Sequence, residues 1–241
     1  MAQVINTNVA SLFAQQALNK SAKALAIAQE RLSSGLRINT GADDPTGLVT
    51  ATGYDSQIRG ANQAARNAND GISTAQINDG YHGQILENLQ RLREIAVQQG
   101  GTATGNAEST ALIAENTRIL ALAANTGTVV VNSNGGTVTG VGTKATLAAA
   151  ANSTVAVYDT DISAVTTARA TYGADIATFN SAIAALGLQS VNTSAALSRI
   201  IDTDYAVETT NLTRNSILQQ AGSAILAQAN QVPNNVLTLL R

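Results

Sequence analysis

Apolar residues recur every seven positions along the last third of the chain, in two series offset by three residues. The first series consists of Ile162, Ile176, Ile183, Leu197, Leu218, Ile225, Val232 and Leu239. The second consists of Val165, Tyr172, Phe179, Leu186, Ile200, Val207 and Ala221. Patterning sustained over this many heptads predicts coiled-coil or long bundle helices rather than a compact globule. Gly187 and the run 190–194 predict a bend within this region.

The start of the chain carries a shorter heptad series that ends in helix-stopping signals. Leu18, Leu25 and Leu32 repeat every seven residues, and residues 33–35 (Ser-Ser-Gly) then provide a stop. The segment 39–47 is rich in turn-forming residues and contains Pro45, which biases the preceding residue away from helix. We therefore expect a linker here between two packed regions.

Two further helices are predicted before the middle of the chain. One begins near residue 46 and runs to about residue 100, and the other covers roughly 107–125. Within the first of these, an apolar face is expected at Ile85, Leu89, Leu92 and Ala96, with His82 one turn earlier. Because helices are predicted from both ends of the chain, they must pack antiparallel.

The middle segment, residues 128–158, has a different pattern. Runs of Val and Thr flank the turn sequence Asn-Gly-Gly at 134–136, which predicts a β-hairpin. Two strands alone are marginally stable, so this hairpin should lean on the helices. The expected fold class is therefore mainly α: a long antiparallel helical bundle or coiled coil built from both termini, with a small β-hairpin in the middle.

Both ends of the chain lack charge, although they read as amphipathic helices. No Asp, Glu, Lys or Arg occurs in residues 2–19 or in residues 215–240. Exposed helices normally carry charges for solubility. We therefore expect other copies of the chain to cover these two uncharged ends. The alternative is that the two ends pack only on each other. Under the first interpretation, the polymerisation core comprises Leu18, Leu25, Leu32, Leu218, Ile225, Val232 and Leu239.

Composition argues against an enzyme, a metalloprotein and a nucleic-acid-binding protein. The chain has one His, no Cys and only 3% aromatic residues, so we expect no catalytic residues, no metal site and no cofactor. The net charge of −2 gives no basic face for nucleic acid. The sequence has no stretch of 18 apolar residues, so we expect no membrane span. It also has no basic segment followed by an apolar one at its start, so we expect no cleaved signal peptide.

Several motifs that could suggest ligand binding are better explained otherwise. The Asp-Thr-Asp triplets at 159–161 and 202–204 lack the rest of a calcium loop, and we interpret them as helix caps. The Gly-rich segment 140–144 lacks the residue order of a phosphate loop and is interpreted as a hairpin turn. His82 has no second ligand candidate of the usual kind and is expected to be a packed or surface side chain.

Four strings resemble bacterial flagellins. They are Met-Ala-Gln-Val-Ile-Asn-Thr-Asn at 1–8, Glu-Arg-Leu-Ser-Ser-Gly-Leu-Arg-Ile-Asn at 30–39 with Asp-Asp at 43–44, Arg-Asn-Ala-Asn-Asp-Gly-Ile-Ser at 66–73, and the tail 217–233. The resemblance covers most of the first half and the last third of the chain. It implies an inner, filament-core domain from 1–40 plus 200–241 and an outer helical domain from 41–199, which includes the hairpin region. It also implies a structural subunit of the flagellar filament that self-assembles into a helical polymer for swimming motility.

The resemblance further implies a surface that the innate immune receptor Toll-like receptor 5 recognises and that also joins subunits. The matching positions are Gln90, Arg91, Glu94, Ile95, Gln98 and Glu115. Ile95 replaces the Leu usual in the family. Considered without the resemblance, Glu87 and Arg91 form an i,i+4 surface pair.

The remaining partners also follow from the resemblance. They are the flagellar cap, the hook-associated proteins and a secretion chaperone that binds the C-terminal helix. The product is expected to be an extracellular filament, exported without a cleaved signal peptide. A flagellar hook–filament junction protein is the nearest alternative, and the string Asn-Gln-Val-Pro-Asn-Asn-Val-Leu at 230–237 favours the filament subunit. A secreted helical enzyme and a free-standing coiled-coil scaffold are alternatives of other classes.

Overall fold

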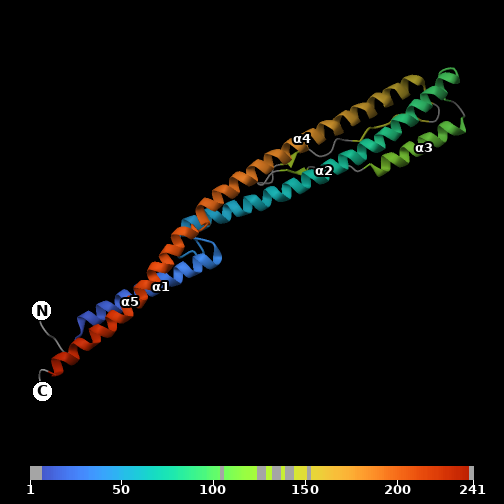
Figure 1. The fold of residues 1–241 in the computed structure, drawn as a ribbon. Coiled ribbons are helices and arrows are strands. Elements are labelled where there is room, and N and C mark those ends of the chain that lie inside the picture. Colours follow the sequence, from blue (N-terminus) through green and yellow to red (C-terminus); the bar gives the residue numbers. More distant parts are fainter. Residues whose placement is uncertain are drawn as a thin grey trace. The chain divides into compact units, whose positions relative to one another are not determined.

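The computed structural model describes residues 7–103, 106–123, 129–131, 137–138, 144–150 and 153–238. These residues form helices α1 (Val9–Ser34), α2 (Pro45–Gln98), α3 (Ala107–Leu122), α4 (Val155–Ile201) and α5 (Tyr205–Thr238), together with the short strands β1 (Val129–Val130) and β2 (Thr137–Val138). The fold is therefore mainly α, as the sequence predicts (Figure 1).

The chain divides into two compact units. Unit 1 comprises Met1–Gly53 with Ala195–Arg241, and unit 2 comprises Tyr54–Ser194. Both divisions fall inside helices, one in α2 and one in α4. The division at 40 and 200 that the family resemblance implies lies instead at the ends of helices, and it stays a prediction.

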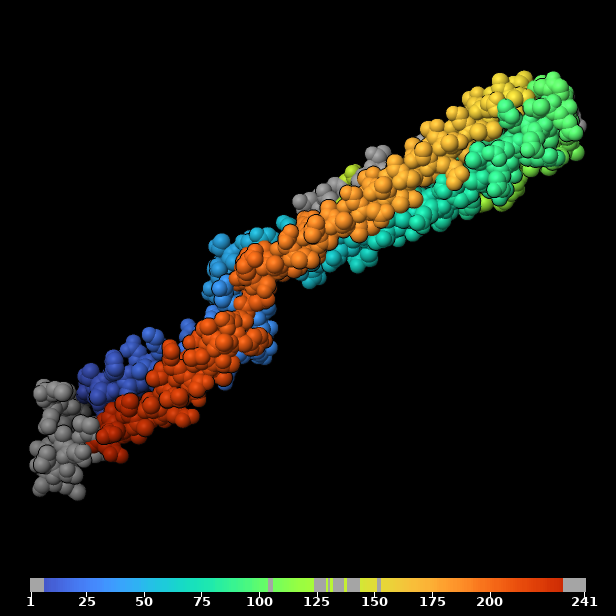
Figure 2. All heavy atoms as spheres, turned by 45° about the horizontal axis from the view of Figure 1, so that its top comes forward, coloured from blue at the N-terminus to red at the C-terminus, as the bar shows by residue number. Residues whose placement is uncertain are grey.

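Unit 1 is built around two antiparallel helices, α1 and α5, which lie side by side in blue and red (Figure 2). Contacts at both ends fix this direction. At one end the Asn8 side-chain amide donates to the Ala229 carbonyl at 2.8 Å. At the other, Leu36 and Asp202 pair their backbones in an isolated antiparallel bridge. The helices thus come from the two ends of the sequence, as predicted.

Local signals explain where the helices of unit 1 stop and start. Gly35 ends α1 in the left-handed conformation, with φ 73°, and its N–H donates to the Arg31 carbonyl at 2.8 Å. The stop predicted at 33–35 is therefore confirmed. Asp204 caps α5, since its Oδ1 accepts from the N–H groups of Ala206 and Val207 at 2.9 and 3.2 Å.

Unit 2 packs α2, α3 and α4 around a main hydrophobic core, with a smaller cluster of Ala61, Ala64 and Leu186, and α2 and α4 are antiparallel. Thr102 and Thr154 pair their backbones where α2 has ended and α4 is about to begin. Further along the two helices, Arg169 forms an ion pair with Asp79 at 2.8 Å. The largest fully buried apolar side chains are Tyr158, Tyr172, Phe179, Ile85, Leu89, Leu92, Ile95 and Val165.

The predicted apolar face of α2 is confirmed. Ile85, Leu89, Leu92 and Ala96 are all completely buried, and so is His82. The observed bounds of α2 also agree with the predicted span of 46–100 to within two residues at each end. Helix periodicity located this element because its buried stripe is continuous.

The bend or loosening predicted near Gly187 does not interrupt the helix, because α4 continues without a break to Ile201. Nothing lies within 4 Å of a Cβ placed on Gly187, so this glycine serves no close approach. The chain instead breaks at residues 202–204, where Asp204 starts a new helix.

This break also shifts the heptad frame by one residue. On α4 the second series is buried at Val165, Tyr172, Phe179 and Leu186, as predicted. Past the break, however, Val207 is 55% exposed. Its neighbour Glu208, 7% exposed, takes the inward position. A single heptad frame from 162 to 239 is therefore wrong, because the interruption adds one residue to the count.

The middle segment is described in part. Strands β1 and β2 pair antiparallel, with Val129 opposite Val138 and Val130 opposite Thr137. The turn predicted between them falls at 132–136, outside the described residues, as does most of the turn predicted at 140–144. Residues 144–150 are neither helix nor strand, and they pair with no strand among the described residues. A hairpin spanning 128–158 stays a prediction.

Replacement of Gly71 by Val should destabilise unit 2. A Cβ at Gly71 would lie 3.0 Å from two ring carbons of Phe179, so the branched side chain must displace that ring. We expect the free energy of unfolding to fall by about 1–3 kcal/mol, measured by urea denaturation with far-UV circular dichroism. Gly80→Val, on the same helix with nothing within 4 Å, is the matched control. Equal effects at both positions would contradict this packing.

Replacement of Asp204 by Ala should fray the start of α5. The change removes the acceptor for two backbone N–H groups, a loss of about 0.5–2 kcal/mol. Amide hydrogen exchange in the first turn of α5 should accelerate accordingly. Asp202→Ala is the control, because the Asp202 carboxylate accepts only from the Ser198 hydroxyl among the described residues. Comparable fraying in both variants would argue against the cap.

Candidate assembly and recognition surfaces

The seam between α1 and α5 is made of small and polar side chains. On α1 the buried residues are Ser11, Ala14, Ser21 and Ala28, spaced by three, seven and seven. On α5, Glu208 and Ala229 are buried, and Gly222 is half-buried between them. Small residues at these positions allow the helix backbones to come close together, but they bury little apolar area.

Gly222 shows how tight this approach is. A Cβ placed on it would lie 3.2 Å from Cδ1 of Leu18, closer than an ordinary van der Waals contact. Near the other end of the seam, Arg31 and Glu208 form an ion pair at 3.7 Å, with the Glu208 side chain almost completely buried. The seam therefore has a defined register but a thin apolar core.

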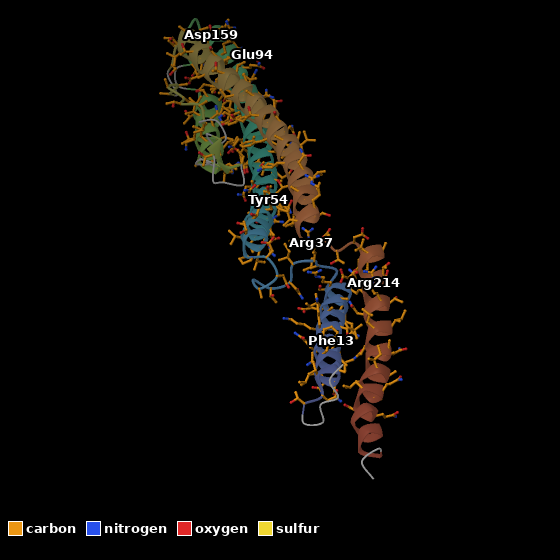
Figure 3. The ribbon with its side chains drawn as sticks, turned by 90° about the vertical axis from the view of Figure 1, so that its left-hand side faces the viewer. Phe13, Arg37, Tyr54, Glu94, Asp159 and Arg214 are labelled. Atoms are coloured by element: carbon orange, nitrogen blue, oxygen red, sulfur yellow. The ribbon has the colours of Figure 1, made fainter. Side chains whose placement is uncertain are left out.

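Many large apolar side chains of these helices are more exposed than buried, although Leu18, Leu25 and Leu32 are half-buried. Phe13, labelled on α1 in Figure 3, is 73% exposed, and Ile225 and Leu218 on α5 are 60% and 51% exposed. The others of this kind on the two helices are Val9, Leu12, Tyr205, Val207 and Ile217. Exposed apolar side chains this numerous on one helix pair are typical of an interaction surface.

A groove of about 410 Å³ runs beside the seam. Its apolar rim includes Leu18 on α1 and Leu218 and Ile225 on α5, and its floor includes Gly222. Lys20 is the only charged residue in its lining. The groove therefore suits an apolar side chain better than a charged ligand.

The predicted polymerisation residues fall into three groups. Leu18, Leu25 and Leu32 are half-buried along α1. Leu218 and Ile225 are mostly exposed on α5. The side chain of Val232 and the whole of Leu239 lie outside the described residues. The structure thus brings Leu18, Leu218 and Ile225 to one groove.

A second candidate surface lies where the end of α2 meets the start of α3. Gln90, Arg91, Glu94 and Gln98 are all exposed there. Arg91 Nε donates to Glu108 Oε1 at 2.8 Å, and its Nη1 donates to Glu94 Oε2 at 3.1 Å. The expected pair of Arg91 with Glu87 is not among the ion pairs of the described residues, because the guanidinium turns toward α3 instead.

The pKa values on this surface follow the same hydrogen bonds. The bond to Glu108, and then the bond to Glu94, raise the pKa of the Arg91 guanidinium above its ordinary value. In return, the bond from Arg91 lowers the pKa of the Glu108 carboxyl. Glu108 was missed by sequence reasoning, although Asn106 caps α3 and an acidic residue in the first turn is a usual companion.

Ile95 and Glu115 differ from the other four predicted recognition residues. Ile95 is 2% exposed, so its side chain supports the surface from the core and offers no area to a partner. Glu115 receives two hydrogen bonds from Arg118, at 2.8 and 2.6 Å, which lower the pKa of its carboxyl. A separate ion pair joins Arg93 to Asp159 at 2.5 Å; Asp159 lies at the same end of unit 2 as Glu94 (Figure 3).

The two Asp-Thr-Asp triplets, which lack the rest of a calcium loop, bond backbone N–H groups. Asp204 is the helix cap that the sequence predicts, whereas Asp161 lies inside α4 and does not cap it. Asp161 instead accepts from the N–H groups of Ala148 and Ala149 at 2.9 and 2.8 Å. No cluster of three or more His, Asp or Glu suited to a metal occurs in the described residues. Within the same residues, no helix is long and apolar enough to cross a membrane.

Comparison with known proteins agrees with this arrangement of helices. Residues 5–135 match the family model of the bacterial flagellin N-terminal helical region, and residues 155–240 match that of the C-terminal helical region. A flagellin of Xenorhabdus nematophila is 36% identical, with both chains covered completely. A flagellar filament 31.3 kDa core protein of Treponema maltophilum is 32% identical, covering 99% of this chain and 100% of its own.

A flagellin of Salmonella typhimurium is more similar over a shorter stretch. It is 51% identical over 120 residues, which are 50% of this chain and 24% of the Salmonella protein. The two family models together cover nearly the whole chain, and the helices they describe are the ones found here at both ends. The chain therefore belongs to the bacterial flagellin family, a structural family whose members are subunits of the flagellar filament.

Proposed function

We propose that this chain polymerises through the outward faces of α1 and α5 into an extracellular helical filament used for swimming. The observation that carries the proposal is the division of side chains between seam and surface. The seam holds Ser, Ala and Gly, while Phe13, Leu218 and Ile225 face outward. A helix pair that is stable as a monomer in water would bury its large apolar side chains in the seam and expose polar ones.

The magnitudes favour association. Each large apolar side chain moved from water into a packed interface contributes about 1.5–3 kcal/mol. Among the residues whose side chains the structure describes, the helix pair exposes eight of them: Val9, Leu12, Phe13, Tyr205, Val207, Ile217, Leu218 and Ile225. Full burial of eight such side chains would contribute at most about 12–24 kcal/mol, against an association cost of about 4–15 kcal/mol. The balance therefore favours association when most of the eight are covered. If the contacts are heterologous and do not close into a ring, the product is an open helical polymer.

A recognition role is proposed for the surface at α2 and α3. Gln90, Arg91, Glu94 and Gln98 are exposed together, and Glu115 is partly exposed on α3. Arg91 is held in place by two carboxylates and so presents a guanidinium of fixed orientation. We propose that Toll-like receptor 5 binds here in the monomer and that neighbouring subunits cover the same surface in the filament.

The remaining parts of the proposal follow from family membership. The inner domain would comprise 1–40 plus 200–241, and the middle segment 128–158 would form a small β-hairpin. The cap and hook-associated proteins would guide assembly, and a secretion chaperone would bind the C-terminal helix. The exposed apolar face of α5 is compatible with a chaperone, because that face would otherwise meet water before assembly.

Replacement of Leu218 and Ile225 by Asn should block assembly without unfolding unit 1. Leu218 and Ile225 are 51% and 60% exposed in the single chain, so their replacement removes apolar area mainly from the surface offered to other copies. Thermal unfolding followed by far-UV circular dichroism checks that unit 1 stays folded. We expect the critical concentration for seeded growth to rise more than tenfold, the factor that corresponds to about 1.4 kcal/mol. Growth is measured by light scattering and electron microscopy.

Ser223→Asn is the matched control for this experiment. It places the same side chain at an exposed position of α5 without removing apolar surface. It should assemble like the parent. If the double variant assembles at the parental concentration, α5 does not contribute these residues to the interface, and the proposal fails.

Replacement of Arg91 by Ala should weaken binding of the monomer to the receptor ectodomain, while far-UV circular dichroism stays unchanged. The ion pairs of Arg91 are exposed, so the fold does not depend on them. Surface plasmon resonance is the measurement. Arg59→Ala is the control, because Arg59 is also an exposed α2 arginine, paired with Asp55 at 2.8 Å. Equal affinities of both variants would refute the assignment.

A further inference from the structure

An extended segment of unit 2, residues 144–150, lies across helices α2 and α4. Its side chains alternate: Ala145, Leu147 and Ala149 face the core, while Thr146 and Ala148 are exposed. Such alternation is typical of a strand, yet within the described part of the chain no strand pairs with this segment. Three of its backbone N–H groups are bonded instead by side chains of the two helices, and Ser153 Oγ accepts from that of Ala150. We call residues 144–150 the strap.

Hydrogen bonds from two side chains, His82 and Asp161, hold the strap, and we call each of these two sites a clasp. At one end the N–H of Ala145 donates to His82 Nε2 at 3.1 Å. Further along, the N–H groups of Ala148 and Ala149 donate to the two oxygens of Asp161, at 2.9 and 2.8 Å. The carboxylate can accept bonds from several donors, whereas the imidazole nitrogen has a single lone pair to offer.

The bonds of His82 determine its protonation state. A backbone N–H can only donate, so Nε2 must be the unprotonated nitrogen. The proton is then on Nδ1, which lies 2.8 Å from the Asn78 carbonyl and donates to it. The folded unit therefore requires a neutral imidazole. A second proton would place two N–H groups face to face between His82 and Ala145.

The charged and titratable groups around His82 do not compensate for a positive imidazole. On α2 the nearest is Asp79, but its carboxylate is already paired with Arg169 of α4 at 2.8 Å. From α4, Tyr172 presents its ring edge-on, with centroids 5.1 Å apart, and burial raises the pKa of its hydroxyl. On the strap, Lys144 precedes Ala145 in the chain. Burial lowers the pKa of His82 below its ordinary value. The hydrogen bond to the Asn78 carbonyl and the charge of Asp79 oppose this lowering but do not reverse it.

We propose that His82 is an acid-sensitive latch: its protonation releases the Ala145 end of the strap from the α2–α4 core, while the Asp161 clasp holds the other end. Release would uncover the apolar surface beneath Ala145 and Leu147, which belongs to the main core cluster of unit 2. The device belongs to unit 2 alone and does not depend on the proposed assembly surface.

The direction of the pH dependence follows from the protons bound in each state. The latched state holds His82 neutral, and the released state binds a proton with a pKa near the ordinary value of about 6.5. The latch is therefore fully stable above that value and weakens as the pH falls below it. Between the two pKa values the opening equilibrium should rise by up to about tenfold per pH unit.

Nuclear magnetic resonance of the full chain tests the latch directly. The sequence contains one His, so its Cε1–H resonance needs no further assignment. We expect this resonance to titrate with a midpoint below 6.5. The hydrogen-exchange protection of the Ala145 amide, corrected for intrinsic exchange, should fall over the same range. The Ala148 and Ala149 amides, bonded to Asp161, serve as the internal reference.

Two variants separate the clasps. In His82→Gln a group that does not titrate replaces the imidazole, and the pH dependence of Ala145 protection between pH 5 and 7 should disappear. In Asp161→Asn the protection of Ala148 and Ala149 should drop at every pH, while the dependence at Ala145 persists. A His82 midpoint at or above the ordinary value, or Ala145 protection that stays constant through the His82 titration, would overturn the proposal. Both readouts come from the wild-type chain and hold even if a variant misfolds.

Discussion

Close approach of α1 and α5 is the constraint on which the rest of unit 1 depends. Most of the buried positions of this seam hold Ser, Ala or Gly, and at Gly222 a Cβ would lie only 3.2 Å from Cδ1 of Leu18. A seam of small residues fixes the register of two helices but removes little apolar area from water. The large apolar side chains must therefore lie on the outer faces, where they become available to other chains.

In unit 2 many large apolar side chains are buried within the chain, unlike those of unit 1. Tyr158, Tyr172, Phe179 and Leu89 are completely buried between α2, α3 and α4, so this unit supplies its own core. A polar pair within this unit joins α2 to α3, where the Asn88 side-chain amide donates to Asn116 Oδ1 at 2.8 Å. The two units therefore differ in packing: unit 2 buries many of its large apolar side chains, whereas unit 1 leaves many of its own exposed, as the proposed assembly surface requires.

Polar residues inside this helical fold act mainly on backbone groups. Asp204 caps α5, Asp161 binds two N–H groups of the strap, and His82 binds a third. An Asp-Thr-Asp triplet alone cannot show which of these roles applies. Asp161 and Asp204 occupy the same place in identical triplets, yet one bonds a segment distant from its own helix turn and the other bonds the turn that follows it.

The sequence by itself determined the class of fold, the bounds of α2, the stop at Gly35 and the family, because periodicity, turn residues and terminal strings are local properties. Tertiary structure decided which face of α5 turns inward, since the break at 202–204 shifts the heptad by one residue and puts Glu208 where Val207 was expected. It also decided that Ile95 is buried and that Arg91 reaches Glu108. Those outcomes depend on which helices become neighbours, and residue spacing along one helix carries no information about the partner that will cover it.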